Sequence, residues 1–364
     1  MTERKLLVER KEENGFSYQI HLRQGFDGIS KAMQEAGLAG KKVCIVTDSR
    51  VAPLYEKELR RVLSELCPEV STFVFPAGES NKNLAVIQNL YEHLIIQGFD
   101  RKSVLVALGG GVVGDMTGYA SATYLRGIDF IQVPTTLLAQ VDSSIGGKTG
   151  VDFLKYKNMV GAFHQPRLVY MNLDTLNTLP AEEFSCGMGE VLKSALICDR
   201  ELYKWLEENQ NFIQSRDIHT LSEMIFRCCC IKRAIVERDP KEQGERALLN
   251  LGHTVGHAVE KLKDFSLLHG QCVAAGTVAA ARISQNRGLL KEEEFQKICS
   301  LNKSFGLPCK VDGLSAAQVL AATKKDKKME NGHIKFILMD GIGKTFIDKT
   351  VSDEELLLGI KELL

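Results

Sequence analysis

The 364-residue chain has no excess of either charge, because 46 lysines and arginines balance 46 acidic residues. It has no basic stripe interleaved with aromatic residues, so we expect no nucleic-acid partner. It has no window of 18 uncharged apolar residues, and its first eleven residues become charged after three apolar ones. We therefore expect no membrane partner and no signal peptide. A hydrophobic content of 44% can fill a sizeable core, and the length predicts two domains rather than one.

The chain also has no C-x-x-C pair, although it contains ten cysteines. Three of these are consecutive, Cys228, Cys229 and Cys230. This pattern favours buried, reduced thiols in a cytoplasmic protein over disulfides or a thiolate metal site.

The sequence divides into two parts with different hydrophobic patterns. Up to residue 179, short β-branched runs alternate with helical patterns, which is typical of an α/β domain with a mainly parallel, Rossmann-like sheet. The expected strands are 42–46, 72–75, 104–108, 130–133 and 168–171. From 180 to 364 the apolar period becomes 3.6, which predicts a mainly helical domain with helices that include 201–210, 221–237 and 273–286. Near the end, 334–339 and 345–348 are expected to form a small hairpin.

In the first domain, the expected strand 104–108 leads directly into a G-x-G-x-x-G match at Gly109, Gly111 and Gly114. Such glycines let a backbone approach a pyrophosphate, and the helix that follows supplies N–H donors. A standard dinucleotide fold also has an acid at the end of the next strand, but Asp129 begins that strand. Asp48 ends an earlier one and could bind a ribose diol. A purely structural turn remains an equal alternative for the glycines.

A second glycine-rich segment ends in Gly146-Gly147-Lys148-Thr149, like a P-loop. The leading glycine of that motif would fall at Asp142, so the phosphate-wrapping loop cannot form. An NTPase is therefore disfavoured, and what remains is a lysine presented among glycines for a phosphate or a carboxylate.

In the second domain, three of the eight histidines lie close together in the sequence: His253, His257 and His269. On a helix, His253 and His257 share a face, and two such imidazoles can reach one Zn²⁺ at about 2.0–2.1 Å. A third histidine could complete the shell and leave one position for substrate. An ordinary helix with two satisfied histidines is the alternative for the H-x-x-x-H spacing taken alone.

Taken together, these motifs resemble 3-dehydroquinate synthase, in order and over nearly the whole chain. The residues that carry the resemblance run from the Gly109-Gly-Gly-Val-Val-Gly-Asp115 loop to the Lys327-Lys328 pair. Between them lie Arg126-Gly127, Gln132-Val-Pro-Thr135-Thr136, Asp142-Ser-Ser-Ile-Gly-Gly-Lys148, Lys157-Asn158, Gly189-Glu190-Val-Leu-Lys193, Leu249-Asn250-Leu-Gly-His253-Thr-Val-Gly-His257 and Leu268-His269-Gly270.

The resemblance implies an enzyme that uses NAD and a divalent metal, zinc or cobalt, and that is a homodimer. Members of this family convert 3-deoxy-D-arabino-heptulosonate 7-phosphate into 3-dehydroquinate and phosphate, in the shikimate pathway of aromatic amino-acid biosynthesis. A hydroxyl is oxidised transiently, phosphate leaves by β-elimination, the ketone is reduced again, and ring opening and aldol closure follow. The implied active site lies in the cleft between the two domains.

The resemblance assigns the metal ligands to Glu190, His253 and His269, so His257 would face the substrate instead. A glutamate and two histidines suit a catalytic zinc with an open position. Positions implied for catalysis are Lys148, Glu242, Asn250 and His257. Substrate contacts are implied for Arg126 (reaching a neighbouring subunit), Asp142, Lys148, Asn158, Lys193, Lys232, Arg246, Asn250, His257, Lys327 and Lys328.

For NAD, the resemblance implies contacts from residues of the first domain. These are Asp48, Gly78, Glu79, Lys82, Gly111, Val112, Val113, Gly114, Asp115, Thr135, Thr136, Lys148, Lys157, Thr175, Leu176, Asn177 and Thr178.

Three other functions stay open at this point. A sister cyclase, such as 2-deoxy-scyllo-inosose synthase, would share the fold, NAD and the metal but act on a different sugar phosphate. A polyol dehydrogenase would release NADH, and the lysine cluster speaks against it. A silent scaffold would be expected to lose metal ligands, yet Glu190, His253 and His269 are all present.

Overall fold

The computed structural model describes residues 3–11, 15–154, 156–264, 266–324, 329–330 and 333–364. The chain divides into two compact units, Met1–Leu179 and Pro180–Leu364, and each is described by itself.

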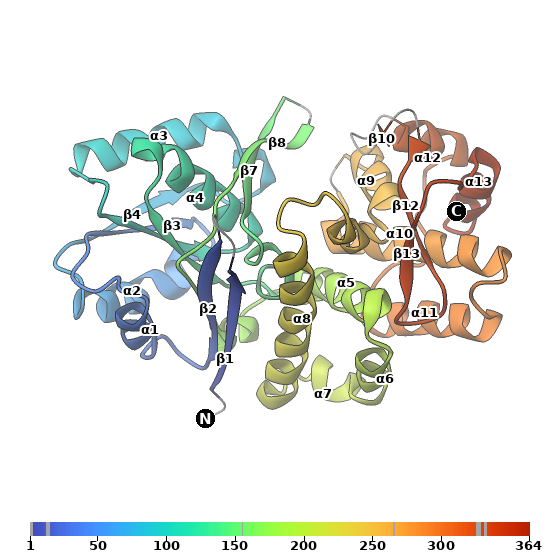
Figure 1. The fold of residues 1–364 in the computed structure, drawn as a ribbon, viewed down its shortest axis with the longest axis horizontal. Coiled ribbons are helices and arrows are strands. Elements are labelled where there is room, and N and C mark those ends of the chain that lie inside the picture. Colours follow the sequence, from blue (N-terminus) through green and yellow to red (C-terminus); the bar gives the residue numbers. More distant parts are fainter. Residues whose placement is uncertain (1–2, 12–14, 155, 265, 325–328, 331–332) are drawn as a thin grey trace. The chain divides into compact units, whose positions relative to one another are not determined.

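The first unit is built on a seven-stranded sheet in the order β1-β2-β9-β6-β5-β3-β4 (Figure 1). All neighbouring strands from β2 to β4 are parallel, and only the edge strand β1 runs antiparallel. The strands are β1 Arg4–Arg10, β2 Phe16–Arg23, β3 Val43–Asp48, β4 Val70–Phe75, β5 Val104–Gly109, β6 Asp129–Pro134 and β9 Leu168–Asn172. The five expected strands correspond to β3, β4, β5, β6 and β9, so the prediction of a mainly parallel sheet is confirmed.

Helices cover both faces of this sheet (Figure 1). Because successive side chains of a strand point to opposite faces, Val43 and Ile45 pack against one helix pair and Cys44 and Val46 against the other. The first pair is α1 Ile29–Glu35 and α2 Ala52–Ser64; the second is α3 Leu84–Ile96 and α4 Gly111–Thr123. Strands buried on both faces read as continuous apolar runs, which is why the sequence shows them clearly.

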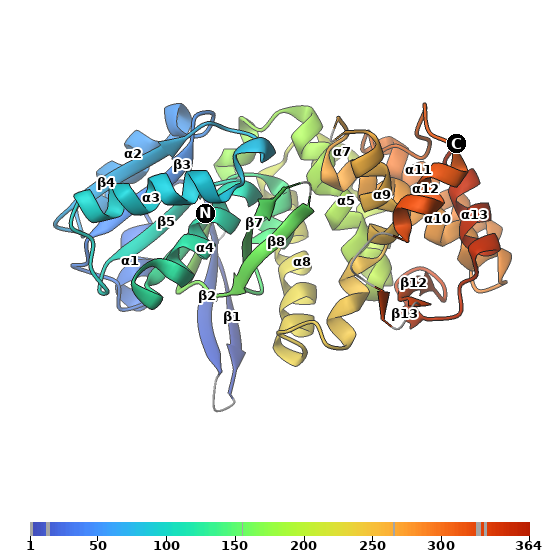
Figure 2. The same ribbon diagram turned by 90° about the horizontal axis from the view of Figure 1, so that it is seen from above.

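Two hairpins of the first unit were not predicted. β1 and β2 add an antiparallel edge to the sheet. β7 Lys148–Phe153 and β8 Tyr156–Phe163 form a separate two-stranded hairpin that packs against α4 (Figure 2).

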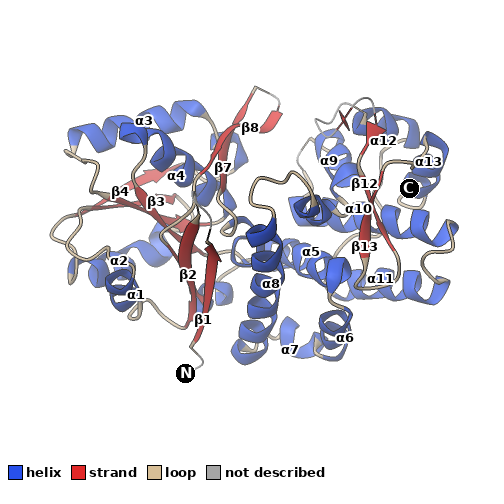
Figure 3. Ribbon diagram, in the orientation of Figure 1, coloured by secondary structure: helices blue, strands red, loops and turns tan. Residues whose placement is uncertain are grey.

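The second unit is mainly helical, as predicted, with two short hairpins (Figure 3). Its helices are α5 Ala181–Cys198, α6 Arg200–Glu208, α7 Gln210–Gln214, α8 Ile218–Arg238, α9 His253–Leu262, α10 His269–Asn286, α11 Glu292–Ser304, α12 Ala316–Thr323 and α13 Asp353–Lys361. The expected hairpin is β12 Phe336–Met339 paired with β13 Thr345–Asp348. The two-residue strands β10 Met329–Glu330 and β11 His333–Ile334 pair with each other.

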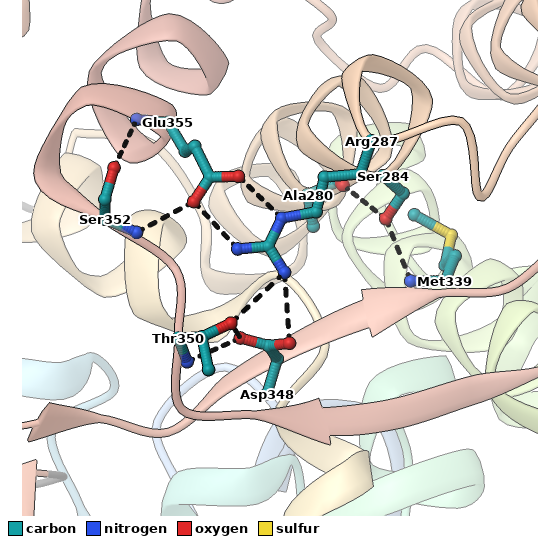
Figure 4. A network of polar contacts seen from close by, with 8 residues as sticks. All are labelled: Ala280, Ser284, Arg287, Met339, Asp348, Thr350, Ser352 and Glu355. Atoms are coloured by element: carbon teal, nitrogen blue, oxygen red, sulfur yellow. Dashed lines mark hydrogen bonds and ion pairs between the residues drawn. The ribbon is translucent and has the colours of Figure 1, made fainter.

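Helix α10 is the centre of this unit, since it packs against α5, α9, α11, α13 and β12. At its C-terminal end, the Arg287 guanidinium donates to both carboxylate oxygens of Glu355, at 2.6 and 2.7 Å, and to Asp348 at 3.0 Å (Figure 4). Glu355 also accepts a bond from the backbone N–H of Ser352, which caps α13. One arginine thus ties α10 to β13 and to the start of α13.

All ten cysteines are free thiols. Six are buried, whereas Cys198 is exposed and three are intermediate, so the expectation of burial holds for six of them. Among the described residues, no helix is long and apolar enough to cross a membrane.

Candidate functional site

The three histidines of the second unit converge at the start of two adjacent helices. His253 is the first residue of α9, His257 lies one turn later, and His269 is the first residue of α10. One nitrogen from each ring lies within 4.8 Å of the others, which makes the three a candidate metal group. The helical H-x-x-x-H arrangement expected from the sequence is therefore present, with a third imidazole beside it.

Glu190 of α5 faces the same point. Its Oε1 lies 3.6 Å from Nε2 of His269 and 3.9 Å from Nε2 of His253. Two ligands at zinc distances and tetrahedral angles stand roughly 3.3–3.5 Å apart, so these three atoms are close to the spacing that one ion requires.

The environment of Glu190 also fits a cation. The side chain is 1% exposed, and its Oε2 forms a close ion pair with Lys193, one turn further along α5. Neither carboxylate oxygen receives a well-aligned hydrogen bond within the described part of the chain. A buried carboxylate is stabilised by positive charge, and Oε1 is directed at two imidazole nitrogens rather than at a donor network. The residues present therefore fit a divalent metal.

Both candidate histidine ligands have their second ring nitrogen next to an oxygen. Nδ1 of His253 lies 3.2 Å from the Leu251 carbonyl oxygen, and Nδ1 of His269 lies 3.5 Å from Oε2 of Glu260. A proton on Nδ1 satisfies these contacts and makes Nε2 the ring nitrogen that can bind a metal. Sequence reasoning missed Glu260, although its spacing of seven residues from His253 places it on the same face of α9.

Close backbone contacts between helices bring these side chains together. A Cβ on Gly270 would lie 1.8 Å from the Cys186 carbonyl oxygen of α5, and one on Gly276 would lie 1.9 Å from the Gly252 carbonyl oxygen. Only glycine permits such approaches. Gly270 follows His269, and Gly252 precedes His253. The tight packing of α10 against its neighbours therefore fixes the backbone positions of both histidines.

One carboxylate, that of Asp239, binds several backbone N–H groups of the segment that follows α8. The Asp239 carboxylate accepts bonds from the backbone N–H groups of Gln243, Gly244 and Arg246, at 2.7–3.0 Å. Although burial acts in the opposite direction, these bonds and the Arg246 charge lower the pKa of Asp239. These bonds restrain the segment that carries Glu242 and the start of the 3-10 helix η5 Glu245–Asn250, which contains Arg246.

Within that loop, Glu242 Oε1 accepts a 2.6 Å hydrogen bond from the Asn250 side chain. Arg246 is 2% exposed and donates to the Pro240 carbonyl oxygen. Lys193 and Lys232 are buried as well, at 2% and 7% exposure. The helical unit therefore contains Lys193, Lys232, Arg246 and Asn250, which are implied for substrate contact together with His257, and the first three are buried cations. Lys327 and Lys328 lie outside the described residues.

In the first unit, most of the residues implied for NAD follow the carboxyl ends of five parallel strands, whereas Lys148 and Lys157 lie on β7 and β8. Asp48 ends β3, Gly78 to Lys82 follow β4, and the first turn of α4 follows β5. Thr135 and Thr136 follow β6, and Thr175 to Thr178 follow β9. In the sheet, β4 lies on one side of β3, and β5, β6 and β9 lie on the other side, so the strand order reverses at β3. Ligands of open α/β sheets bind at such a switch point.

The glycine motif has a packing role that is visible in the structure. A Cβ on Gly114 would lie 2.6 Å from Oε1 of Gln132, so this glycine lets α4 approach β6 closely. Asp48 also has a local role, because its Oδ1 accepts bonds from the N–H groups of Arg50 and Val51 at the start of α2. These roles are compatible with a nucleotide site at the same strand ends.

A buried lysine connects three of the implied contacts. Lys82 Nζ donates to Asp115 Oδ2 at 2.6 Å and to Asn158 Oδ1 at 2.5 Å. Although burial favours the neutral form, the charges of Asp115 and Glu79 raise the pKa of Lys82. Lys157 forms an ion pair with Glu79 at 3.1 Å. The loop after β4, the first turn of α4 and β8 are thus joined by charge.

Several implied site residues have strained backbones. Arg126, Asn158 and Glu242 adopt positive φ angles of 70°, 50° and 56°, which only glycine adopts without cost. Such strain of about 1–3 kcal/mol is concentrated at functional sites. Arg126 and Lys148 are exposed, whereas Asp142 lies half-buried in the π-turn η3 Ala139–Ser143.

Comparison with known proteins places both units in one family. The family model described as 3-dehydroquinate synthase N-terminal matches residues 72–186, and that described as 3-dehydroquinate synthase C-terminal matches residues 187–329. A curated 3-dehydroquinate synthase of Acetivibrio thermocellus is 44% identical over 342 residues, which is 94% of either chain. The chain belongs to the 3-dehydroquinate synthase family.

Solved structures of related cyclases share this fold. A 2-epi-5-epi-valiolone synthase from Streptomyces hygroscopicus, solved with NAD⁺ and Zn²⁺, is 27% identical with a TM-score of 0.88, covering 96% of this chain and 97% of its own. A 2-deoxy-scyllo-inosose synthase with the same TM-score is 24% identical and covers both chains fully, so it supports the fold alone. The polypeptide is thus more similar to the synthase of A. thermocellus than to either sister cyclase.

Proposed function

We propose that this protein is a 3-dehydroquinate synthase, a lyase that converts 3-deoxy-D-arabino-heptulosonate 7-phosphate into 3-dehydroquinate and phosphate. The observation that carries the proposal is the convergence of Glu190, His253 and His269 beside Lys193, in a chain that belongs to this family. The 44% identity to a curated 3-dehydroquinate synthase favours this substrate over those of the sister cyclases.

We assign the metal to Glu190, His253 and His269, and the nucleotide to the strand ends of the first unit. Bound zinc or cobalt supplies Lewis acidity toward a substrate hydroxyl, and bound NAD⁺ supplies a hydride acceptor that is restored within each turnover. Asp48 is our candidate for a ribose diol, and the first turn of α4, Gly111 to Asp115, for the pyrophosphate. Lys82, Lys157, Glu79 and the threonines after β6 and β9 complete the proposed nucleotide contacts.

The anionic groups of the substrate are assigned to the buried cations of the second unit. A phosphate and a carboxylate each need charged donors to offset their desolvation, and Lys193, Lys232 and Arg246 supply three. Arg246 is our candidate for the carboxylate because its planar fork matches that group. Lys148, Asn158, Asp142 and the Lys327/Lys328 pair remain proposed contacts.

Proton transfer is assigned to His257, Glu242, Asn250 and Lys148. His257 stands one turn from His253, with 5.1 Å between ring centroids, so it can lie beside the metal without being a ligand. Glu242 Oε1 accepts a hydrogen bond from the Asn250 amide at an N···O distance of 2.6 Å, which restrains the orientation of both side chains. A positioned base removes the proton next to the transient ketone, and a nearby acid assists phosphate departure.

We propose a homodimer in which Arg126 contacts the phosphate of the substrate that is bound by the neighbouring subunit. Arg126 is exposed, and an apolar surface lies on the β7–β8 hairpin, at Phe153, Leu154, Tyr156, Met159 and Phe163. Exposed apolar patches commonly mark protein interfaces, which supports a second copy of the chain as the partner. Light scattering is expected to give a mass in solution of twice the chain mass, and the Phe163→Asp variant is expected to have a lower mass.

We also propose a cytoplasmic location, which ten free thiols support.

The substrate assignment is tested by comparing two sugar phosphates. The purified protein with NAD⁺ and Zn²⁺ is expected to release phosphate from the heptulosonate phosphate far faster than from glucose 6-phosphate, which lacks the carboxylate. A preference for glucose 6-phosphate would favour a sister cyclase. Net NADH formation from a polyol would favour a dehydrogenase.

A further inference from the structure

Glu260 belongs to the metal centre by position, although it is not one of the proposed ligands. Its side chain is 4% exposed, and its Oε2 lies 3.5 Å from Nδ1 of His269. On α9 it follows His253 by seven residues and His257 by three, so all three lie on the helix face directed at the start of α10. The burial of a carboxylate is costly, and here it occurs beside an imidazole.

The two proposed histidine ligands are held differently. His253 has an 11% exposed side chain and its Nδ1 lies next to a neutral carbonyl oxygen, that of Leu251. His269 has a 31% exposed side chain, is the first residue of its helix, and has its Nδ1 next to the charged oxygen of Glu260. The more exposed of the two rings therefore has the stronger acceptor behind it.

We infer that Glu260 is a positioning residue for the metal centre, which holds the His269 imidazole so that Nε2 faces Oε1 of Glu190. This inference rests on the proposed function, because it takes His269 as a ligand. With the proton on Nδ1 directed at Glu260, the ring has one tautomer and one orientation. The carboxylate also makes the imidazole a more basic ligand.

The size of the effect follows from what such a partner supplies. Loss of a residue behind a ligating histidine typically weakens metal binding by about 10–100-fold. Glu260→Ala removes both the charge and the acceptor. Glu260→Gln keeps the size of the side chain and one carbonyl acceptor but removes the charge, so it is expected to have a smaller effect.

The test uses Co²⁺ alone as the probe, on the full chain freed of metal. A competing chelator gives the Kd, and the visible absorption of bound Co²⁺ reports ligand geometry. We expect Glu260→Ala to raise the Kd by about 10–100-fold, and Glu260→Gln to raise it less while altering the Co²⁺ spectrum. Glu294→Ala is the control, because its partly buried carboxylate lies on α11 and pairs with Arg200 instead. It is expected to bind Co²⁺ like the wild type.

Three outcomes distinguish the role of Glu260 from the assignment of the metal centre itself. Wild-type affinity and spectrum in both Glu260 variants, with Co²⁺ binding lost in Glu190→Ala, would overturn the inference and leave the metal centre intact. Wild-type Co²⁺ binding by Glu190→Ala would instead overturn the proposed centre. If metal-free Glu260→Ala melts at a lower temperature, Glu260→Gln decides: a raised Kd with unchanged melting supports positioning, and an unchanged Kd contradicts it.

Discussion

The Nε2 atom of His269 lies 3.6 Å from Oε1 of Glu190, and these two side chains come from helices that are far apart in the sequence. A hydrogen bond does not account for the pair, because neither oxygen of Glu190 receives a well-aligned one within the described residues. The spacing instead fits two ligands of one ion.

Glu190→Ala is expected to remove bound metal and activity together, because the two remaining imidazoles hold zinc weakly. Metal content by elemental analysis and phosphate release are measured on the same preparation. Glu182→Ala, in the exposed first turn of the same helix, is the control and is expected to retain both. Stoichiometric metal and normal turnover in Glu190→Ala would exclude this residue as a ligand.

His257→Ala is expected to keep the metal but to lose turnover by about 10²-fold or more, since we assign it to proton transfer. His253→Ala, one turn earlier on α9, should lose the metal itself. The paired measurement is metal content and kcat. Equal metal loss in both variants would make His257 a metal ligand, as in the simple H-x-x-x-H arrangement.

Arg246→Ala is expected to lower kcat/KM by about 10²-fold or more, because it leaves a charged group of the substrate unpaired. Arg246→Lys should recover only part of this loss, since a point charge cannot replace the planar fork. NAD⁺ and metal binding are measured to show that the site is intact. Arg238→Ala is the control, because Arg238 pairs with Glu245 at the exposed end of α8. Normal kcat/KM in Arg246→Ala would rule out the assignment.

The Arg287–Glu355 pair predicts a pH dependence of stability. The hydrogen bonds from Arg287 and from the Ser352 N–H lower the pKa of Glu355 from 4.5 to about 2. A lowered folded-state pKa contributes stability that is complete above the unfolded value and is lost as the pH falls from about 4.5 to about 2. Because the pair is partly exposed, we expect Glu355→Gln to cost about 1 kcal/mol at pH 7.

Urea unfolding of wild type and Glu355→Gln, followed from pH 7 down to pH 2.5, measures this difference. The difference in free energy of unfolding between the two proteins is expected to decrease below pH 4.5. A difference that stays constant over this range would show that the charge of Glu355 does not stabilise the fold. Asp340→Asn removes the acid of an exposed pair with Lys344 and serves as the control.

The sequence predicted best what depends on local pattern. Strands such as Val104–Gly109 are buried on both faces and read as apolar runs, and the glycines after them mark the turn into α4. The β1–β2 and β7–β8 hairpins were missed because their strands do not read as apolar runs. β1 carries four charged residues in seven, and β8 has no buried position.

The metal centre shows where local reasoning ends. The H-x-x-x-H spacing indicated His253 and His257, but Glu190 lies more than sixty residues earlier and is brought to His253 only by helix packing. It entered the prediction through family resemblance. Glu260 was missed in both ways, because its importance depends on the orientation of His269 as well as on its own helix position. Contacts of this kind follow from tertiary structure.

In the proposed reaction, an oxidation and a reduction cancel within one turnover at a metal-dependent site. The most direct measurement follows phosphate release from the heptulosonate phosphate together with absorbance at the NADH wavelength, before and after treatment with a chelator. We expect many equivalents of phosphate for each NAD⁺ bound, no net NADH, loss of release on chelation, and recovery with Zn²⁺ or Co²⁺. NADH that accumulates in step with product, or phosphate release that continues without metal, would exclude this reaction.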